Sequence, residues 1–343
     1  MELSIIIVNW KSVDFTQQCL ASITANAGDL HYEVIVIDNA SWDGCGEMIR
    51  REFPQVMFIQ SNQNLGFAGA NNLAFSKSTG RKVLFLNPDT EIQGSALQTL
   101  LSALESLPDA GMVGARLLNS DRTLQTHCVV ALPSILNQTL NSEFLRKTFP
   151  TWSLWGTRPL FESDNTPASV EAITGACMLL KRQVNEQIGG FSSNYFMYSE
   201  DMDLCIKVAK AGWKIYYIPT AEIVHHAGGS SGSREESNFS TLMVRESLTQ
   251  FMTIHHGNAY AALFRFVTGA MAFLRVLLLL LVSPLALHPA GYRRIRRAIS
   301  KWWGVLAWSL DAKAWVSRQS QLQTFRTLPV TRDSEAHKIP QEV

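Results

Sequence analysis

Near-continuous apolar runs recur along the first quarter of the chain and constrain its fold more than any other feature. Residues 3–9 (LSIIIVN) and 32–37 (YEVIVI) are such runs, and residues 12–25 between them carry apolar side chains at helical spacing. A continuous β-branched run fits a strand that is buried on both faces, as in a parallel sheet. Shorter runs at 56–59 and 83–86 repeat the pattern. The sequence therefore predicts a Rossmann-like α/β fold with a mostly parallel central sheet and helices on both faces.

Composition limits the classes of protein and partner. The chain has 343 residues, 46% of them hydrophobic, and a formal net charge of +1. This length suits one large domain with an appendage, or two domains, and the charge balance predicts no nucleic-acid partner. The five cysteines are scattered and form no CxxC pair, which indicates reduced thiols in a cytosolic compartment rather than a zinc site. The first ten residues have an acid where a secretory signal has basic residues, so we expect no such signal.

Polar residues follow three of the predicted strands. Asp38 ends the second strand, a Gly-containing segment at 64–72 follows the third, and Asp89 follows the fourth in an Asn-Pro-Asp turn. Ligands of doubly wound sheets bind at the carboxyl ends of strands. Asp38 could bond a ribose or a base, the glycines could let a phosphate approach, and Asp89 could hold Mg²⁺ or Mn²⁺ on a diphosphate. The alternative for both acids is an ordinary turn residue. No GxGxxG follows the first strand, which argues against dinucleotide binding.

The densest group of acids lies in FMYSEDMDLC, residues 196–205. Glu200, Asp201 and Asp203 fall within four positions, and apolar residues at helical spacing continue from there as far as Gly212. The acids are thus expected at a helix N-terminus, where the macrodipole and free N–H groups stabilise negative charge. An aspartate kept ionised there suits a general base. The alternative is that Asp201 or Asp203 only caps the helix.

Three further segments carry candidate residues. The strand predicted at 170–181 is interrupted by Gly175, and a glycine within a strand often marks close approach of a ligand. The segment EIVHHAGGSS at 222–231 puts His225 and His226 before a Gly-rich loop, where a histidine is either a ligand or a buried structural residue. Residues 119–166 are rich in Trp, Phe, Pro and Ser, and predict a variable loop whose aromatics either stack on a sugar or lipid head or form a satellite cluster.

The C-terminal part differs in kind. Residues 264–287 are strongly apolar and nearly long enough to span a bilayer, but Arg275 near the centre and Pro284 near the end argue against a clean span. Basic residues and tryptophans follow, namely Arg293, Arg294, Arg296, Arg297, Lys301, Trp302, Trp303 and Trp308. They suit a protein that rests on an anionic membrane surface. A buried helical hairpin that closes the domain is the alternative.

Seven motifs together resemble the inverting family 2 glycosyltransferases of GT-A fold, and within them the bacterial rhamnosyltransferase-like branch. They occur in the family's order and cover roughly residues 3–245. The motifs are IIIVNW (5–10), VIDNASWDG (36–44), NLGFAGANN (64–72), FLNPDT (85–90), TGACMLLKR (174–182), GGFSSNYFMYSEDMDLC (189–205) and IVHHAGGSS (223–231).

The resemblance implies a role for each motif. Nucleotide-sugar binding is expected from Asn9, Asp38, Asn64, Gly66, Asp89 and Glu200. Asp201 matches the catalytic base, with Glu200 behind it and Asp203 as the polar anchor of the helix. Asp89 matches the metal-binding acid, and Asn87 replaces the first acid of the family's DxD element. His225 matches a metal or diphosphate contact, with His226 as its competitor.

The expected function is therefore transfer of a sugar, with rhamnose as the candidate. The donor is a nucleotide-diphosphate sugar, and the acceptor is a cell-envelope glycan or a lipid-linked precursor. The reaction is expected to invert the anomeric centre with Mg²⁺ or Mn²⁺ as cofactor, at the cytoplasmic face of the cell membrane. A nucleotidyltransferase and a non-catalytic sugar- or membrane-binding module are the alternatives. The expected organisation is a GT-A domain at 1–245, a membrane-associating helical region at 246–328 and a disordered tail at 329–343.

Overall fold

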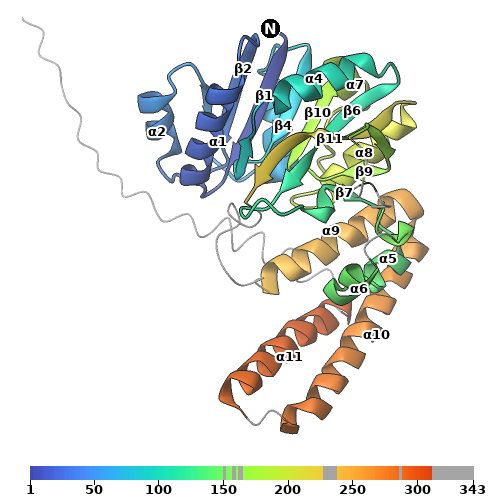
Figure 1. Ribbon diagram of the computed structural model, residues 1–343. Coiled ribbons are helices and arrows are strands. Elements are labelled where there is room, and N and C mark those ends of the chain that lie inside the picture. Colours follow the sequence, from blue (N-terminus) through green and yellow to red (C-terminus); the bar gives the residue numbers. More distant parts are fainter. Residues whose placement is uncertain (150–151, 157–159, 161–164, 227–237, 286–287, 311–343) are drawn as a thin grey trace, which may run out of the picture.

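The computed structural model describes residues 1–149, 152–156, 160, 165–226, 238–285 and 288–310. Figure 1 shows an α/β domain at the top and a group of long helices below it. The predicted tail at 329–343 lies outside the described residues.

A nine-stranded sheet forms the centre of the described α/β domain, in the order β3-β2-β1-β4-β10-β6-β11-β5, with β8 paired to β11. The first four strands in this order are mutually parallel, as are β6 and β11, while β10, β5 and β8 run antiparallel to their neighbours. This confirms the predicted α/β class. The strands are β1 (Leu3–Asn9), β2 (Tyr32–Asp38), β3 (Met57–Gln60), β4 (Lys82–Leu86), β5 (Thr90–Ile92), β6 (Ala110–Leu118), β8 (Ala168–Val170), β10 (Cys177–Lys181) and β11 (Lys214–His225).

Helices cover both faces of the sheet because alternate residues of its buried strands point to opposite sides. Ile5 and Ile7 of β1 pack into one cluster with α1, α2 and α4, whereas Ile6 and Val8 pack into a second cluster with α3, α7 and α8. The bounds are α1 (Val13–Asn26), α2 (Cys45–Glu52), α3 (Gly66–Phe75), α4 (Ala96–Ser106), α7 (Arg182–Ile188) and α8 (Glu200–Lys210). The five cysteines are free and buried.

The segment predicted as a variable loop forms short helices instead. They are η1 (Thr126–Cys128), α5 (Ile135–Thr139), α6 (Glu143–Thr148) and η2 (Ser153–Trp155), and a small sheet of β7 (Val129–Val130) with β9 (Ala172–Ile173) lies beside them. The hydroxyls of Ser134 and Ser142 accept hydrogen bonds from backbone N–H groups in the first turns of α5 and α6. Such caps stabilise helices too short to form on propensity alone. Among the aromatics, Trp155 is buried.

Three long helices follow, α9 (Asn238–His256), α10 (Asn258–Val282) and α11 (Pro289–Leu310), with η3 (Ser283–Leu285) between the last two. Figure 1 shows α10 and α11 as a hairpin that projects away from the sheet, with α9 between the hairpin and the α/β domain. Phe251, Phe264, Val305 and Trp308 form their common core. The expected boundary at residue 245 falls inside the continuous helix α9, and the division into domains stays a prediction.

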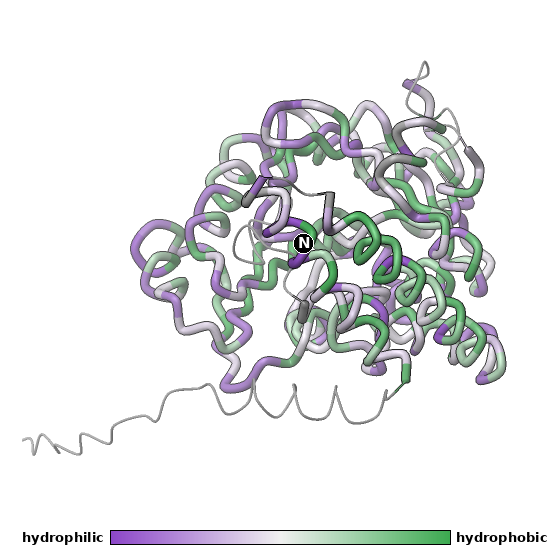
Figure 2. The backbone as a smooth tube through the Cα atoms, turned by 90° about the horizontal axis from the view of Figure 1, so that it is seen from below, coloured by the Kyte–Doolittle hydropathy of each residue, from purple (hydrophilic) through white to green (hydrophobic). Residues whose placement is uncertain are grey.

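The outer side of α10 is apolar and exposed. Only 17% of its most apolar 18-residue window is buried, and by length and composition the helix could cross a membrane. Leucine and phenylalanine side chains at positions 263, 266, 273, 274, 277, 278, 280 and 281 are all more than two-fifths exposed. Figure 2, viewed from below, shows hydrophobic helical turns on this side of the molecule. The helical hairpin that the sequence offered as an alternative is thus present, but the outer face of α10 is exposed.

Candidate active site

One cavity of about 490 Å³ lies at the carboxyl ends of β1, β2 and β4, where ligands of such sheets bind. The ends of these strands, the start of α8, the short helices and α9 all contribute to its wall. The polar or aromatic lining residues are Trp10, Asn39, Asn64, Phe67, Asn87, Asn137, Gln138, Asn141, Arg146, Trp155, Thr174, Tyr198, Ser199, Glu200 and Asp201. Of the predicted site residues, Asn64, Gly66, Glu200 and Asp201 line the cavity, whereas Asn9, Asp38, Asp89 and His225 do not.

A sharp turn places the acids at the start of α8. Tyr198 and Ser199 have φ angles of 70° and 64°, a left-handed conformation that is uncommon outside glycine and asparagine. Local strain of this kind is tolerated where surrounding structure imposes it, often at functional sites. The turn directs the partly exposed Asp201 to the cavity and leaves Glu200 buried beside it.

Backbone N–H groups fix the carboxylate of Asp201. Its Oδ2 accepts a hydrogen bond of 2.9 Å from Gly175 N, and its Oδ1 accepts one of 2.8 Å from Met202 N. A Cβ added at Gly175 would lie 3.3 Å from Cβ of Asp201, a tight contact. The glycine that interrupts the predicted strand at 170–181 therefore lets the backbone approach the carboxylate of Asp201, and Gly175 itself lines the cavity.

Glu200 and Asp201 form a coupled pair. Burial raises the pKa of Asp201, opposed by the two N–H donors. Burial, and then the charge of Asp201, raise the pKa of Glu200 to about 8. Glu200 is 7% exposed, and its Oε2 has no hydrogen-bond partner among the described residues, as suits a neutral carboxyl group. With a pKa of about 8, Glu200 is mostly protonated at neutral pH. The two N–H donors favour the ionised form of Asp201.

Asp203 has a different position. It is 2% exposed and does not line the cavity. Its Oδ1 accepts a hydrogen bond of 2.8 Å from His255 Nε2 of α9, and its Oδ2 lies 3.6 Å from Nζ of Lys207. The contact with His255 ties α8 to α9, and the contact with Lys207 lies within α8.

The loops on the other side of the cavity are held by amide side chains. Asp38 is 1% exposed, and its two oxygens accept hydrogen bonds from Asn9, Ser41, Trp42 N and Gln60. In this conformation Asp38 and Asn9 order the turn after β2 and do not face the cavity. Asn39, which the sequence analysis did not single out, lines the cavity and donates to Asn64 Oδ1 at 3.0 Å. Oδ1 of Asn39 also accepts a hydrogen bond of 2.8 Å from Leu65 N, so Asn39 links the loop after β2 to the loop after β3.

Asp89 and His225 face each other beneath Asn87 and Pro88 of the cavity wall. Nε2 of His225 lies 3.5 Å from Oδ1 of Asp89. The side-chain Nε2 of Gln125 donates a hydrogen bond of 2.6 Å to the backbone carbonyl oxygen of His225. The side-chain oxygen of Gln125 lies 3.0 Å from Nδ1 of His225 and accepts the proton of that ring nitrogen. Nε2 is therefore the ring nitrogen that faces Asp89, and in the tautomer with its proton on Nδ1 it carries a lone pair.

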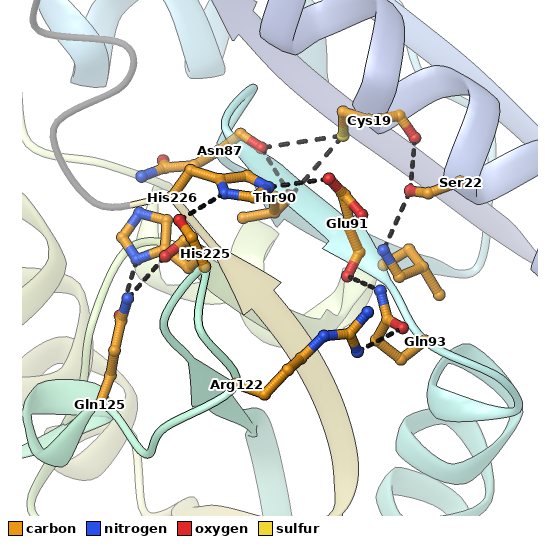
Figure 3. Close-up of polar contacts among 12 residues, drawn as sticks. Cys19, Ser22, Asn87, Thr90, Glu91, Gln93, Arg122, Gln125, His225 and His226 are labelled. Atoms are coloured by element: carbon orange, nitrogen blue, oxygen red, sulfur yellow. Dashed lines mark hydrogen bonds and ion pairs between the residues drawn. The ribbon is translucent and has the colours of Figure 1, made fainter.

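A carboxylate and a lone-pair nitrogen at this separation fit a divalent cation between them. His226 points elsewhere and binds Glu91 and Ser120 at 2.8 Å each, as Figure 3 shows for the contact with Glu91. The described residues contain no cluster of three or more acidic, histidine or cysteine side chains that could hold a metal ion. A cation here would therefore need further ligands from the substrate.

Comparison with known proteins gives the family. Residues 4–189, more than half of the chain, match the sequence profile of glycosyl transferase family 2. The chain belongs to the family 2 glycosyltransferases. It is 28% identical over 243 residues to N-acetylglucosaminyl-diphospho-decaprenol L-rhamnosyltransferase of Mycobacterium tuberculosis, covering 67% of this chain and 78% of that protein. It is also 28% identical over 230 residues to rhamnosyltransferase WbbL of Escherichia coli, covering 65% and 83%.

A solved structure supports the GT-A fold of this glycosyltransferase. Mannosyltransferase PcManGT from Pyrobaculum calidifontis, in complex with GDP-Man and Mn²⁺, superposes with a TM-score of 0.54 at 19% identity. The match covers 91% of this chain and 88% of that one. The fold and the rhamnosyltransferase-like resemblance predicted from the seven motifs are thus confirmed.

Proposed function

We propose that this glycosyltransferase moves rhamnose from a nucleotide-diphosphate sugar to a hydroxyl group of a lipid-linked cell-envelope precursor, with inversion at the anomeric carbon. The observation that carries the proposal is the carboxylate of Asp201, held by two N–H groups at the edge of a cavity at the strand ends. The choice of sugar rests on the two rhamnosyltransferase relatives, and the choice of a lipid-linked acceptor on the N-acetylglucosaminyl-diphospho-decaprenol L-rhamnosyltransferase.

The chemistry follows from the arrangement of acids. The acceptor hydroxyl gives its proton to Asp201 as its oxygen bonds to the anomeric carbon, and the bond from that carbon to the diphosphate oxygen breaks. General-base catalysis of this kind contributes roughly a hundredfold to ten-thousandfold in rate. Neutral Glu200 beside Asp201 leaves one negative charge at the site, which limits repulsion of the diphosphate. Attack from the side opposite the leaving group produces the inversion.

Asp89 and His225 are the residues that would hold Mg²⁺ or Mn²⁺. Such an ion neutralises the negative charge that develops on the departing nucleoside diphosphate. Because the chain itself offers these two ligands, the diphosphate oxygens would supply others, and donor and metal would bind together. The Mn²⁺ present in the mannosyltransferase complex supports the use of a divalent cation.

We also propose that the α10–α11 hairpin binds the cytoplasmic surface of the membrane. The exposed apolar side chains of α10 lie next to the arginines at 293, 294, 296 and 297 of α11, which are exposed as well. An apolar face flanked by basic residues suits the interface of an anionic leaflet. A lipid-linked acceptor would be found there.

The decisive experiment compares wild type with Asp201→Asn on dTDP-rhamnose, UDP-sugars and GDP-mannose, with Mn²⁺ and a lipid acceptor. We expect release of a nucleoside diphosphate from one donor and a product of opposite anomeric configuration by NMR. Asp201→Asn should lose at least a hundredfold in kcat while binding that donor normally. Full activity in Asp201→Asn would refute the base assignment. Release of pyrophosphate would instead indicate a nucleotidyltransferase, and no turnover of any donor would favour a binding module.

A further inference from the structure

Arg146 of α6 is the one Lys or Arg side chain among the described residues that line the cavity. Its Nε donates a hydrogen bond of 2.8 Å to Oδ1 of Asn141, and its guanidinium carbon lies 5.5 Å from the centre of the Trp155 ring. Both of these neighbours also line the cavity. Among the described residues no acidic side chain forms an ion pair with Arg146, whose contacts there are a neutral amide and an aromatic ring.

A half-buried guanidinium whose described contacts are a neutral amide and an aromatic ring has lost part of its hydration. Burial lowers the pKa of Arg146, and desolvation is the cause, yet a guanidinium remains charged at neutral pH. Because Nε of Arg146 donates to Asn141, the plane of the guanidinium group is fixed. Its two terminal nitrogens are then oriented for paired hydrogen bonds to phosphate oxygens. The site is thus organised for an anionic group of the substrate.

The position of Arg146 indicates which substrate supplies the anion. The pair of Asp89 and His225 lies at the strand ends, whereas Arg146 belongs to the wall formed by the short helices. That wall continues into Val244 and Leu248 of α9, which also line the cavity. α9 and α5 both pack against α10, the helix with the exposed apolar face. Arg146, the aliphatic side chains of Val244 and Leu248, and the exposed apolar face of α10 therefore follow one another along this side of the cavity.

We propose that Arg146, positioned by Asn141, binds the diphosphate of a lipid-linked sugar acceptor, whose lipid chain leaves the cavity along α9 and α10. The inference rests on the proposed function and specifies its acceptor: the diphosphate lies beside the reacting sugar, and the apolar chain follows it. Arg146 would fix the acceptor sugar relative to Asp201 without taking part in bond making.

The test uses one acceptor sugar on two carriers. The full-length protein is given N-acetylglucosamine linked to farnesyl diphosphate, or octyl N-acetylglucosaminide, which has no phosphate. Arg146→Gln should lose roughly 10- to 100-fold in kcat/KM on the diphosphate acceptor, as expected for hydrogen bonds to a charged group. Activity on the octyl glycoside and the KM for the donor should not change. Arg146→Lys keeps the charge and should fall between wild type and Arg146→Gln.

Arg122→Gln is the matched control, because Arg122 is exposed, bonds Gln93 at 2.8 Å and does not line the cavity. Calorimetric binding of farnesyl diphosphate to wild type and Arg146→Gln tests the subsite even if no sugar is transferred. Equal losses on both acceptors, a raised donor KM, or unchanged binding of farnesyl diphosphate would each overturn the proposal. Failure of the proposed function itself would appear as wild-type protein that turns over no donor.

Discussion

At the scale of single residues, the coupled acids give a prediction about pH. Because the pKa of Glu200 is about 8 in the folded protein and near 4.5 when unfolded, the folded state binds more protons between these values. Stability should therefore fall as pH rises through this range. Glu200→Gln removes the ionisation, so its melting temperature should match wild type at pH 5 and exceed it by several degrees at pH 9. Thermal melts at both pH values check this, and a pH-independent difference would contradict it.

The two adjacent histidines give a second prediction at this scale. His225 faces Asp89 and is oriented by Gln125, whereas His226 is occupied by Glu91 and Ser120. His225→Gln should raise the Mn²⁺ concentration needed for half-maximal activity by roughly tenfold or more. His226→Gln is the matched control and should leave that concentration nearly unchanged. If His226→Gln has the larger effect, the ligand assignment is wrong.

At the scale of elements, the start of α3 packs directly against the segment that precedes α8. Gly66 has a φ of 71°, and a Cβ there would lie 2.3 Å from the carbonyl oxygen of Phe196. That oxygen accepts a hydrogen bond from Phe67 N at 3.0 Å. A side chain at position 66 would separate the loop that lines the strand-end side of the cavity from the segment that leads to Asp201.

Gly66→Ala should therefore destabilise the protein by about 2–5 kcal/mol, the sum of a left-handed backbone cost and a steric clash. Gly94→Ala is its control, because Gly94 also has a positive φ of 50° but its Cβ would meet nothing within 4 Å. It should cost only about 1–2 kcal/mol. Urea denaturation of both variants measures the difference, and equal costs would show that the contact with Phe196 is unimportant.

The elements also show how far sequence reasoning reaches. Buried strands and the acid-rich start of α8 were predictable because hydrophobic period and helix-end chemistry are local properties. Arg146 and Asn39 were not, because their importance depends on the cavity that distant segments form around them. For His225 and His226 the sequence left two candidates, and the contacts of Gln125 and Glu91, from elsewhere in the chain, distinguish their orientations.

At the scale of the whole molecule, the hairpin is directed so that its far end can meet a membrane. Figure 1 shows α10 and α11 joined at the end most distant from the sheet. The last turns of α10 carry Leu281, 74% exposed, and the first turns of α11 carry the exposed arginines. The guanidinium carbon of Arg275 lies 4.1 Å from the ring centre of Trp302 of α11, so this arginine packs between the two helices. Among the described helices only α10 is long and apolar enough to span a membrane, and our proposal places the hairpin on the membrane surface.

The membrane prediction follows from that orientation. Replacing Arg293, Arg294, Arg296 and Arg297 by Gln should weaken binding to vesicles containing anionic phosphatidylserine by roughly 10²- to 10³-fold, since each basic residue near such a surface contributes about 1 kcal/mol. Binding of wild type should also fall as salt screens the charges. Arg50→Gln with Arg51→Gln, two exposed arginines of α2, is the matched control and should bind like wild type. Vesicle co-sedimentation measures all three proteins. If the fourfold variant sediments as well as wild type, or binds neutral phosphatidylcholine equally, the basic end of the hairpin does not hold the enzyme on the membrane.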